Sequence, residues 1–243
     1  MKEYFGASSG VYVQTKGKRF LLMPAIERYL PKASAVGARL LDVGCGSGDF
    51  CTLAEPKGYR YVGFDVSADM VARARESHPS GECVVGDART MSTTFQDPFD
   101  ALIVSMLLPA LGERADMQSV LLQCRGLMRP DSTLLVAVTH PSFDHYMQNF
   151  LFDRTDVRTT FKGYYASGQR FEIDQKMHNE IFTFEDYHWT LTDYVEAITK
   201  ADLTIAAIDE CPPDERSLTP TDHPWAQNRH NFPTYMLFVL RKR

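Results

Sequence analysis

The sequence predicts an α/β fold in which helices cover a mostly parallel β-sheet. Short apolar segments rich in β-branched residues alternate with longer amphipathic segments, as strands and helices of such folds do. The first of these apolar segments runs directly into a glycine-rich loop that opens a helix. Hydrophobic residues make up 44% of the 243 residues, which is enough for a sizeable core in one domain spanning the chain.

Seven segments are predicted to be strands, because each is short and largely apolar, as strands buried on both faces of a sheet are. They are residues 39–43, 61–65, 82–86, 99–105, 133–139, 203–209 and 234–240.

Helices are predicted between these strands, at residues 67–77, 114–128 and 190–200. Ser67 is a suitable N-cap for the first of them. Apolar residues recur at helical spacing through the second, which is expected to stop before Pro130 because proline cannot continue a helix. Thr190, followed three residues later by Asp193, resembles a capping box at the start of the third.

Two regions interrupt the alternation. Residues 1–35 precede the first strand and are predicted to form an N-terminal segment and a helix. Residues 141–189 are rich in aromatic side chains, and within them 170–177 and 180–189 are candidates for a hairpin that turns at His178-Asn179. A long insertion beside strand ends is predicted to form a substrate cap.

Charge and composition argue against several classes of partner. The formal net charge of −5 provides no electrostatic attraction for nucleic acid. No uncharged apolar stretch approaches the ~20 residues needed to span a bilayer, and the N-terminus lacks the apolar run of a signal peptide. The five cysteines contain no C-x-x-C pair, so reduced thiols are expected. We therefore expect a cytoplasmic protein, a monomer or homodimer, with no nucleic-acid or membrane partner.

The glycine-rich loop Gly44-x-Gly46-x-Gly48 allows a tight turn and lets a ligand approach backbone N–H groups. A dinucleotide-binding fingerprint requires Gly-x-Gly-x-x-Gly, whereas Asp49 stands at the last glycine position here. Asp42 precedes the loop, where its carboxylate suits a cationic amine and would repel a pyrophosphate. The loop therefore predicts a ligand with an amino group and without phosphates.

Two further acids follow predicted strands. Asp65 ends the second strand, where a carboxylate can accept hydrogen bonds from ribose hydroxyls. Asp87, in Gly86-Asp87-Ala88, follows the third strand, where it can accept a hydrogen bond from an adenine amino group. Together with Asp42 these acids predict a site for adenine, ribose and a charged amino-acid tail.

These motifs resemble those of the class I S-adenosylmethionine-dependent methyltransferases. The resemblance covers residues 38–140 most strongly, through Leu41-Asp-Val-Gly-Cys-Gly-Ser-Gly48, Asp65, Gly86-Asp87-Ala88 and Phe99-Asp-Ala-Leu-Ile-Val-Ser105. It implies a Rossmann-like seven-stranded sheet of order 3-2-1-4-5-7-6 whose last strand is antiparallel. Pro130-Asp131-Ser132 stands where the family often has Pro-Gly-Gly, a departure that concerns a turn.

The resemblance also implies the cofactor S-adenosyl-L-methionine and the roles of individual residues. The glycine loop would hold the methionine portion, Asp65 the ribose, and Asp87 the adenine amine. Val66 and Met70 would cover one adenine face, and N-terminal tyrosines would cover the carboxylate. The complete predicted cofactor set is Tyr4, Tyr12, Asp42, Gly44, Cys45, Gly46, Asp65, Val66, Met70, Asp87, Ala88, Ser105 and Met106.

Candidate catalytic and substrate-binding residues lie after the fifth strand. His140 ends that strand and is a candidate general base; the alternative is a histidine that hydrogen-bonds nearby backbone. Tyr165 is the second catalytic candidate, because tyrosines of the cap can surround a sulfonium. The predicted substrate-binding residues are Phe143, Tyr146, Tyr164, His188 and Trp189, with packing in the cap core as the alternative. We predict no metal site.

The function expected from this resemblance is methyl transfer to an oxygen, nitrogen or carbon atom of a small molecule. Ser105-Met-Leu-Leu108 replaces the Asn-Pro-Pro-Tyr that methylation of nucleic-acid bases or glutamine side chains would require. One alternative is a non-methylating reaction, such as cyclisation or cleavage at another sulfonium C–S bond. More distant alternatives are a non-catalytic binding module and a dinucleotide dehydrogenase.

Overall fold

The computed structural model describes residues 17–142, 155–157, 161–177, 180–214, 218–219 and 222–243. Seven strands form the main sheet in the order β3-β2-β1-β4-β5-β10-β9. Strand β10 pairs antiparallel with both of its neighbours, while β1 to β5 pair in parallel. Counted along the chain, this is the predicted order 3-2-1-4-5-7-6 with an antiparallel last strand, so the predicted fold is confirmed.

The strands lie close to the predicted segments. Their bounds are β1 Arg39–Val43, β2 Arg60–Asp65, β3 Glu82–Val85, β4 Phe99–Ser105, β5 Met128–Thr139, β9 Leu203–Asp209 and β10 Tyr235–Lys242.

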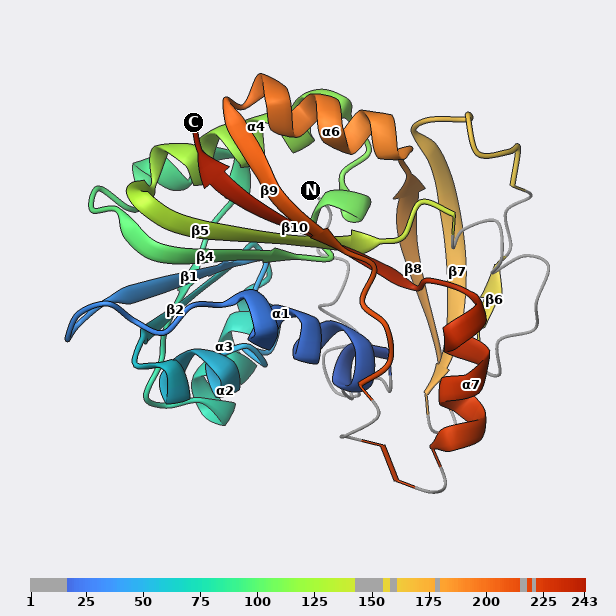
Figure 1. The fold of residues 1–243 in the computed structure, drawn as a ribbon, viewed down its shortest axis with the longest axis horizontal. Coiled ribbons are helices and arrows are strands. Elements are labelled where there is room, and N and C mark those ends of the chain that lie inside the picture. Colours follow the sequence, from blue (N-terminus) through green and yellow to red (C-terminus); the bar gives the residue numbers. More distant parts are fainter. Residues whose placement is uncertain (1–16, 143–154, 158–160, 178–179, 215–217, 220–221) are drawn as a thin grey trace.

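Helices cover both faces of this sheet (Figure 1). One face carries α1, α2 and α3, and the other carries α4 and α6. Because successive side chains of a strand point to opposite faces, Leu41 and Val43 pack under α4 and α6, while Leu40 packs under the other layer. The helix bounds are α1 Met23–Tyr29, α2 Cys51–Ala54, α3 Ala68–Ser77, α4 Arg114–Gly126, α6 Leu191–Lys200 and α7 His223–Asn231.

Shorter helical turns connect these elements. They are the π-helical η2 Lys18–Leu22 and the 3-10 turns η3 Glu55–Lys57, η4 Ala88–Thr93 and η5 Leu108–Ala110. Two predicted caps are present: the Ser67 hydroxyl accepts from the Met70 N–H, and Thr190 and Asp193 form a reciprocal capping box.

The predicted helix 114–128 was wrong at its end. It stops at Gly126, and Met128 already pairs with Phe99 as the first residue of β5. Pro130 lies inside this irregular start of the strand, where the register shifts. Helix α7 was not predicted at all, because its Pro-containing, polar sequence shows no amphipathic period.

A second, three-stranded antiparallel sheet forms between β5 and α6 in the chain. It contains β6 Thr155–Val157, β7 Gln169–Met177 and β8 Glu180–His188, in the order β6-β7-β8. Met177 pairs with Glu180, which confirms the predicted hairpin. This small sheet stands at the end of the main sheet where the parallel strands finish (Figure 1). No helix of the described residues is long and apolar enough to cross a bilayer.

Candidate functional site

The loop after β1 is held in a conformation that favours glycine. Gly44, Gly46 and Gly48 have φ angles of 74°, 54° and 81°, a left-handed region that side chains disfavour. A Cβ on Gly44 would also lie 3.3 Å from the Leu107 side chain. Cys45, the remaining loop residue of the predicted set, is buried, and this burial raises the pKa of its thiol. Such a thiol packs within the loop and is a poor nucleophile.

Asp65, at the end of β2, is tied to this loop. Its Oδ2 accepts a hydrogen bond from the Gly46 N–H at 2.9 Å, and its Oδ1 accepts from the Ser67 N–H at 2.9 Å. Burial raises the pKa of the carboxyl, although these backbone donors act in the opposite direction. Each carboxylate oxygen has a second lone pair. The group is therefore fixed in place with capacity for a ligand diol.

Asp42 lies beneath the loop, at the end of the adjacent strand β1. It is 1% exposed, and the Tyr61 hydroxyl donates a hydrogen bond to its Oδ2 at 2.6 Å. Burial raises the pKa of Asp42 to about 7, and the Tyr61 hydrogen bond and Lys18 partly offset this rise. A buried acid with a pKa near neutrality is poised to ionise when a cation approaches.

Lys18 brings a positive charge to the same loop from the N-terminal π-helical turn. Its Nζ lies 2.7 Å from the Asp49 carboxylate and 5.0 Å from the centre of the Phe50 ring. The sequence did not single out Lys18 or Tyr61, because nothing local to residues 17–22 or 60–65 signals that they meet the loop. Asp42 and Lys18 together suit the amino and carboxylate ends of an amino-acid group.

The next part of the site lies at the ends of β2 and β3. Met70 is 2% exposed, and its Cε is 3.6 Å from where a Cβ on Gly46 would stand; Val66 is half-buried. Asp87 is bound by Arg89, with a closest N–O distance of 2.6 Å, and this hydrogen bonding lowers the pKa of Asp87. Ala88 follows it and is buried.

At the end of β4 the backbone takes an unusual conformation. Met106 has a φ of 57°, a left-handed angle that is uncommon for residues other than glycine, and its N–H donates to the Ala137 carbonyl at 2.8 Å. Ser105 and Met106 are both half-buried. Backbone held in such a conformation is frequent where a chain turns beside a binding site.

His140, at the end of β5, has both ring nitrogens engaged. Its Nε2 lies 3.1 Å from Glu210 Oε1, and its Nδ1 accepts from the Ser142 N–H at 3.2 Å. Burial lowers the pKa of His140, whereas Glu210 raises it. Since Nδ1 accepts the Ser142 N–H, the ring proton lies on Nε2, which donates it to Glu210. A base role for His140 stays a prediction.

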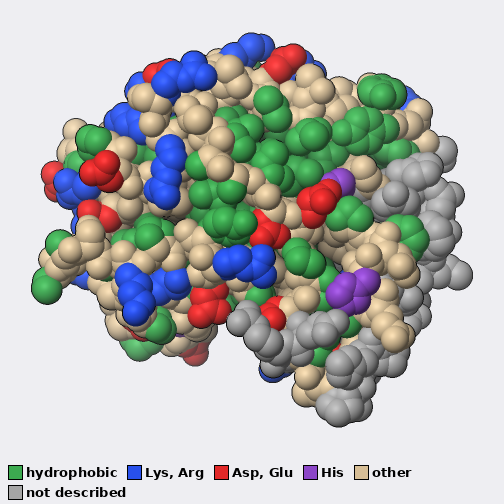
Figure 2. All heavy atoms as spheres, viewed as in Figure 1, with side chains coloured by type: hydrophobic (Ala, Val, Ile, Leu, Met, Phe, Trp, Pro, Cys, Tyr) green, Lys and Arg blue, Asp and Glu red, His purple; other side chains and the backbone are tan. Residues whose placement is uncertain are grey.

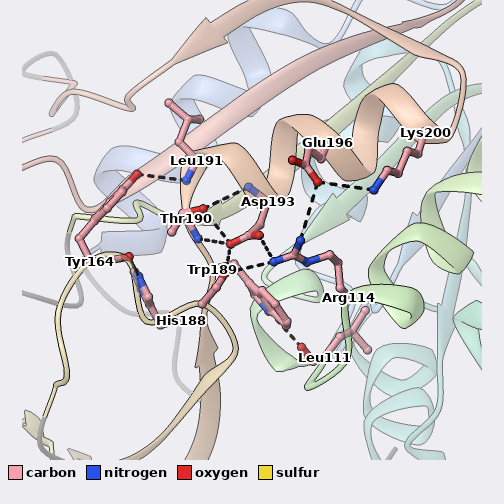
Figure 3. Close-up of polar contacts among 11 residues, drawn as sticks. Leu111, Arg114, Tyr164, His188, Trp189, Thr190, Leu191, Asp193, Glu196 and Lys200 are labelled. Carbon is pink, nitrogen blue, oxygen red and sulfur yellow. Dashed lines mark hydrogen bonds and ion pairs between the residues drawn. The ribbon is translucent and has the colours of Figure 1, made fainter.

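Three of the predicted substrate-binding residues form the anchor of the cap (Figure 3). His188 is fully buried and its Nε2 lies 2.7 Å from the Tyr164 carbonyl oxygen. Trp189 is 4% exposed and donates from Nε1 to the Leu111 carbonyl at 3.1 Å. The Tyr164 hydroxyl accepts from the Leu191 N–H at 3.1 Å. These contacts support the packing alternative more than contact with a substrate.

The remaining predicted residues lie elsewhere. Tyr165 is 91% exposed, with its ring 5.3 Å from that of Tyr164, and a catalytic role for it stays a prediction. Four further predicted residues lie outside the described part of the chain: Tyr4, Tyr12, Phe143 and Tyr146.

The chain is similar in sequence to known methyltransferases. Residues 41–136 match the family model of a methyltransferase domain. The chain is 28% identical to N-demethylindolmycin N-methyltransferase of Streptomyces griseus over 83% of this chain and 84% of the relative. It is 25% identical to a ubiquinone biosynthesis O-methyltransferase of Rhodopseudomonas palustris over 46% of this chain, a match that spans 44% of that relative.

Solved structures share the fold. An S-adenosylmethionine-dependent methyltransferase from Mesorhizobium loti superposes with a TM-score of 0.65 at 22% identity, covering 90% of this chain and 96% of that one. The CcbJ methyltransferase from Streptomyces caelestis superposes with a TM-score of 0.68 at 14% identity, covering 99% and 96%. At these identities the likeness establishes the fold.

Proposed function

We propose that the chain is a class I S-adenosylmethionine-dependent methyltransferase and that it methylates an oxygen, nitrogen or carbon atom of a small molecule. The observation that carries the proposal is that acids from the ends of two neighbouring strands, β1 and β2, both lie at the glycine loop. Asp42 lies under the glycine loop, and Asp65 is hydrogen-bonded to the backbone of that same loop. This arrangement accepts an adenosyl group linked to an amino-acid tail.

The residues present fit S-adenosylmethionine. Asp42 and Lys18 bind its ammonium and carboxylate, and Asp65 accepts hydrogen bonds from its ribose hydroxyls. Val66 and Met70 cover the adenine, whose amine lies toward Asp87. Bound in this way, the cofactor supplies an electrophilic methyl group on a sulfonium.

Positioning of the acceptor is the main contribution of the protein, because a bound, oriented acceptor replaces a bimolecular encounter. Ser105 and Met106 line the cofactor side of the acceptor position. His140 takes a proton from the acceptor at Nδ1, after that nitrogen gives up its hydrogen bond with the Ser142 amide.

Several further features belong to the proposal. Residues 1–35 cover the cofactor and residues 141–189 cover the acceptor, in a cytoplasmic protein that acts as a monomer or homodimer without nucleic acid or membrane. The Streptomyces griseus relative, which matches 83% of this chain and 84% of its own length, is named as an N-methyltransferase. An acceptor nitrogen is therefore the first to test, ahead of oxygen and carbon.

Calorimetry with S-adenosylmethionine, followed by product analysis, tests the proposal. Binding that produces S-adenosylhomocysteine with an acceptor supports methyl transfer. Methylthioadenosine as the product would instead establish reaction at another sulfonium bond. Absence of binding at millimolar cofactor would leave a non-catalytic module.

A further inference from the structure

A tyrosine near the start of β2 reaches the glycine loop that follows β1. Tyr61 is 3% exposed, and its hydroxyl donates a hydrogen bond to Asp42 Oδ2 at 2.6 Å. The same hydroxyl lies 3.6 Å from where a Cβ on Gly48 would stand. The Tyr61 hydroxyl therefore lies against both the carboxyl of Asp42 and the last glycine of the loop.

Glycines leave the space through which the Tyr61 ring extends. Residues 61 and 63 of β2 point to the same face of the sheet, and Gly63 is the direct neighbour of Asp42 on β1. A Cβ on Gly63 would lie 3.2 Å from Tyr61 Cε1, and a Cβ on Gly81 would lie 2.9 Å from Tyr61 Cδ1. A side chain at either position would crowd the ring. The packing therefore holds the Tyr61 hydroxyl at Asp42.

The carboxyl of Asp42 depends on this one hydrogen bond. Its Oδ2 accepts the Tyr61 hydroxyl, whereas Oδ1 receives no hydrogen bond within the described part of the chain. Lys18 acts on Asp42 at longer range, and its Nζ is paired with Asp49 at 2.7 Å. A buried carboxylate without a paired cation is costly to ionise. Oδ1 is therefore the atom that an incoming ammonium group would satisfy.

The Tyr61 hydrogen bond also favours the charged form of Asp42, because a hydroxyl donates more strongly to a carboxylate than to a protonated acid. Burial raises the pKa of Asp42 to about 7, and Tyr61 is the largest influence that opposes this rise. Burial raises the pKa of Tyr61 itself well above its ordinary value. The hydroxyl consequently remains a donor across the neutral range and lowers the cost of ionising Asp42.

Other titratable groups face Asp42 from the elements packed around it. They come from the N-terminal turn, the loop, α2, β2 and β3, and they are Lys18, Cys45, Asp49, Cys51, Asp65 and Cys83. Burial raises the pKa of all three thiols, so they stay neutral near pH 7. Asp65 takes its hydrogen bonds from the Gly46 and Ser67 N–H groups instead of Tyr61. Removal of the Tyr61 hydroxyl therefore acts chiefly on Asp42.

We propose that Tyr61 is a positioning residue of the cofactor site, whose hydroxyl holds Asp42 with one oxygen left for the cofactor ammonium and favours the charged form of that carboxyl. Tyr61 acts through Asp42 and not on the reacting atoms. When the ammonium binds at neutral or lower pH, the Asp42 carboxyl releases its proton to solvent and the two charges balance. This inference rests on the proposed function, because the ammonium belongs to the cofactor of that reaction.

Tyr61→Phe tests the inference, because it keeps the ring and removes the hydroxyl. Calorimetry measures the dissociation constant of S-adenosylhomocysteine for this variant and for the wild-type protein between about pH 6 and about pH 9. The variant is expected to bind about 10-fold more weakly near pH 6 and to approach the wild-type affinity as Asp42 ionises at higher pH. Titration of the ligand's own amine cancels from this ratio. A ratio that does not change with pH overturns the inference.

The same substitution in an Asp42→Asn background shows whether Tyr61 acts through Asp42. Asparagine does not ionise, so loss of the hydroxyl should there change the affinity by less than about 2-fold at every pH. An equal loss in both backgrounds would assign Tyr61 to packing of the loop and contradict the inference. Tyr59→Phe is the matched control, because Tyr59 is a buried tyrosine of the same apolar layer. It should keep the wild-type affinity throughout.

Site-specific 3-fluorotyrosine at position 61 keeps both the ring and the hydroxyl, which guards against failure of Tyr61→Phe to fold. Fluorine withdraws electrons and makes the hydroxyl a stronger donor, so S-adenosylhomocysteine should bind more tightly near pH 6. Unchanged or weaker binding there would count against the inference. If the wild-type protein does not bind S-adenosylhomocysteine, the proposed function fails and this inference fails with it. If the wild-type protein binds it and Tyr61→Phe binds it equally well, the inference about Tyr61 fails alone.

Discussion

Replacement of Asp42 by asparagine changes one charge in the buried part of the site. Asp42 is 1% exposed and accepts the Tyr61 hydroxyl at 2.6 Å. Asparagine has nearly the same shape as the protonated acid, keeps an oxygen that accepts this hydrogen bond, and does not ionise. Asp42→Asn therefore represents the protonated state at every pH.

The pKa of Asp42 fixes the sign of the effect. Burial raises this pKa from 3.8 to about 7 in the folded protein. The folded state consequently holds a proton that the unfolded chain has released. The resulting stabilisation is fully present below pH 3.8 and is lost as the pH rises through about 7.

The magnitude follows from the same pKa. One pKa unit corresponds to about 1.36 kcal/mol. Raising the pH from about 5.5 to about 8.5 should therefore destabilise the wild-type protein by ~2 kcal/mol relative to Asp42→Asn, which corresponds to a shift in Tm of ~4–8 °C for a chain of this size.

Urea unfolding of the free protein at a series of pH values measures the effect. Subtracting the wild-type free energy of unfolding from that of Asp42→Asn removes the contribution of other titrating groups. Asp131→Asn, which makes the same substitution at an exposed residue, is the control. A flat difference for Asp42→Asn would show that burial does not perturb this carboxyl, and the electrostatic account of the loop would fail.

Three further changes test other parts of the structure. Asp65→Ala should weaken S-adenosylmethionine binding at least 10-fold while the protein stays folded, since charge-assisted hydrogen bonds contribute about 1.5–3 kcal/mol. Calorimetry measures the affinity and circular dichroism checks the fold. Unchanged affinity in a folded variant refutes the ribose assignment. Gly86→Ala should destabilise the protein by about 1–3 kcal/mol, because the new Cβ would lie 2.4 Å from the Phe64 ring; urea unfolding measures it, and a neutral result would contradict the tight packing there. Asp193→Ala removes the capping partner of Thr190 and the ion-pair partner of Arg114 (Figure 3), so unfolding should become easier by about 1–3 kcal/mol. Limited proteolysis should then cut the cap faster, and wild-type stability and cleavage would show that the cap is held by other contacts.

The sheet could be predicted because its signals are local. Each parallel strand is a short apolar run of residues. The glycines of the loop stand where the backbone has positive φ angles, which other residues avoid. The family resemblance then gave the strand order. The closeness of Asp42 to Asp65 could also be predicted from the sequence, because the carboxyl ends of neighbouring parallel strands lie at one edge of the sheet.

The parts that sequence could not provide depend on distant contacts. Lys18 reaches Asp49 across 31 residues of chain, and Arg229 approaches the sheet from a helix without an amphipathic pattern. Figure 2 shows hydrophobic side chains exposed across much of one face, so an apolar or aromatic residue type does not by itself indicate burial. His188 and Tyr165 illustrate this within the cap, one fully buried and the other 91% exposed.

The charged groups at the glycine loop are not expected to distinguish the cofactor from its demethylated product. S-adenosylmethionine and S-adenosylhomocysteine carry the same ammonium, carboxylate and ribose, so Asp42, Lys18 and Asp65 should bind both alike. Recognition of the sulfonium must therefore depend on groups nearer the transferred methyl. Under the proposed function, Ser105 and Met106 at the end of β4 line that position, and Met106 has a left-handed backbone angle. The left-handed backbone at Met106 sets how the chain turns after β4, a strand that lies in the sequence between the glycine loop and His140. Substitutions at Ser105 and Met106 should therefore alter turnover more than cofactor affinity.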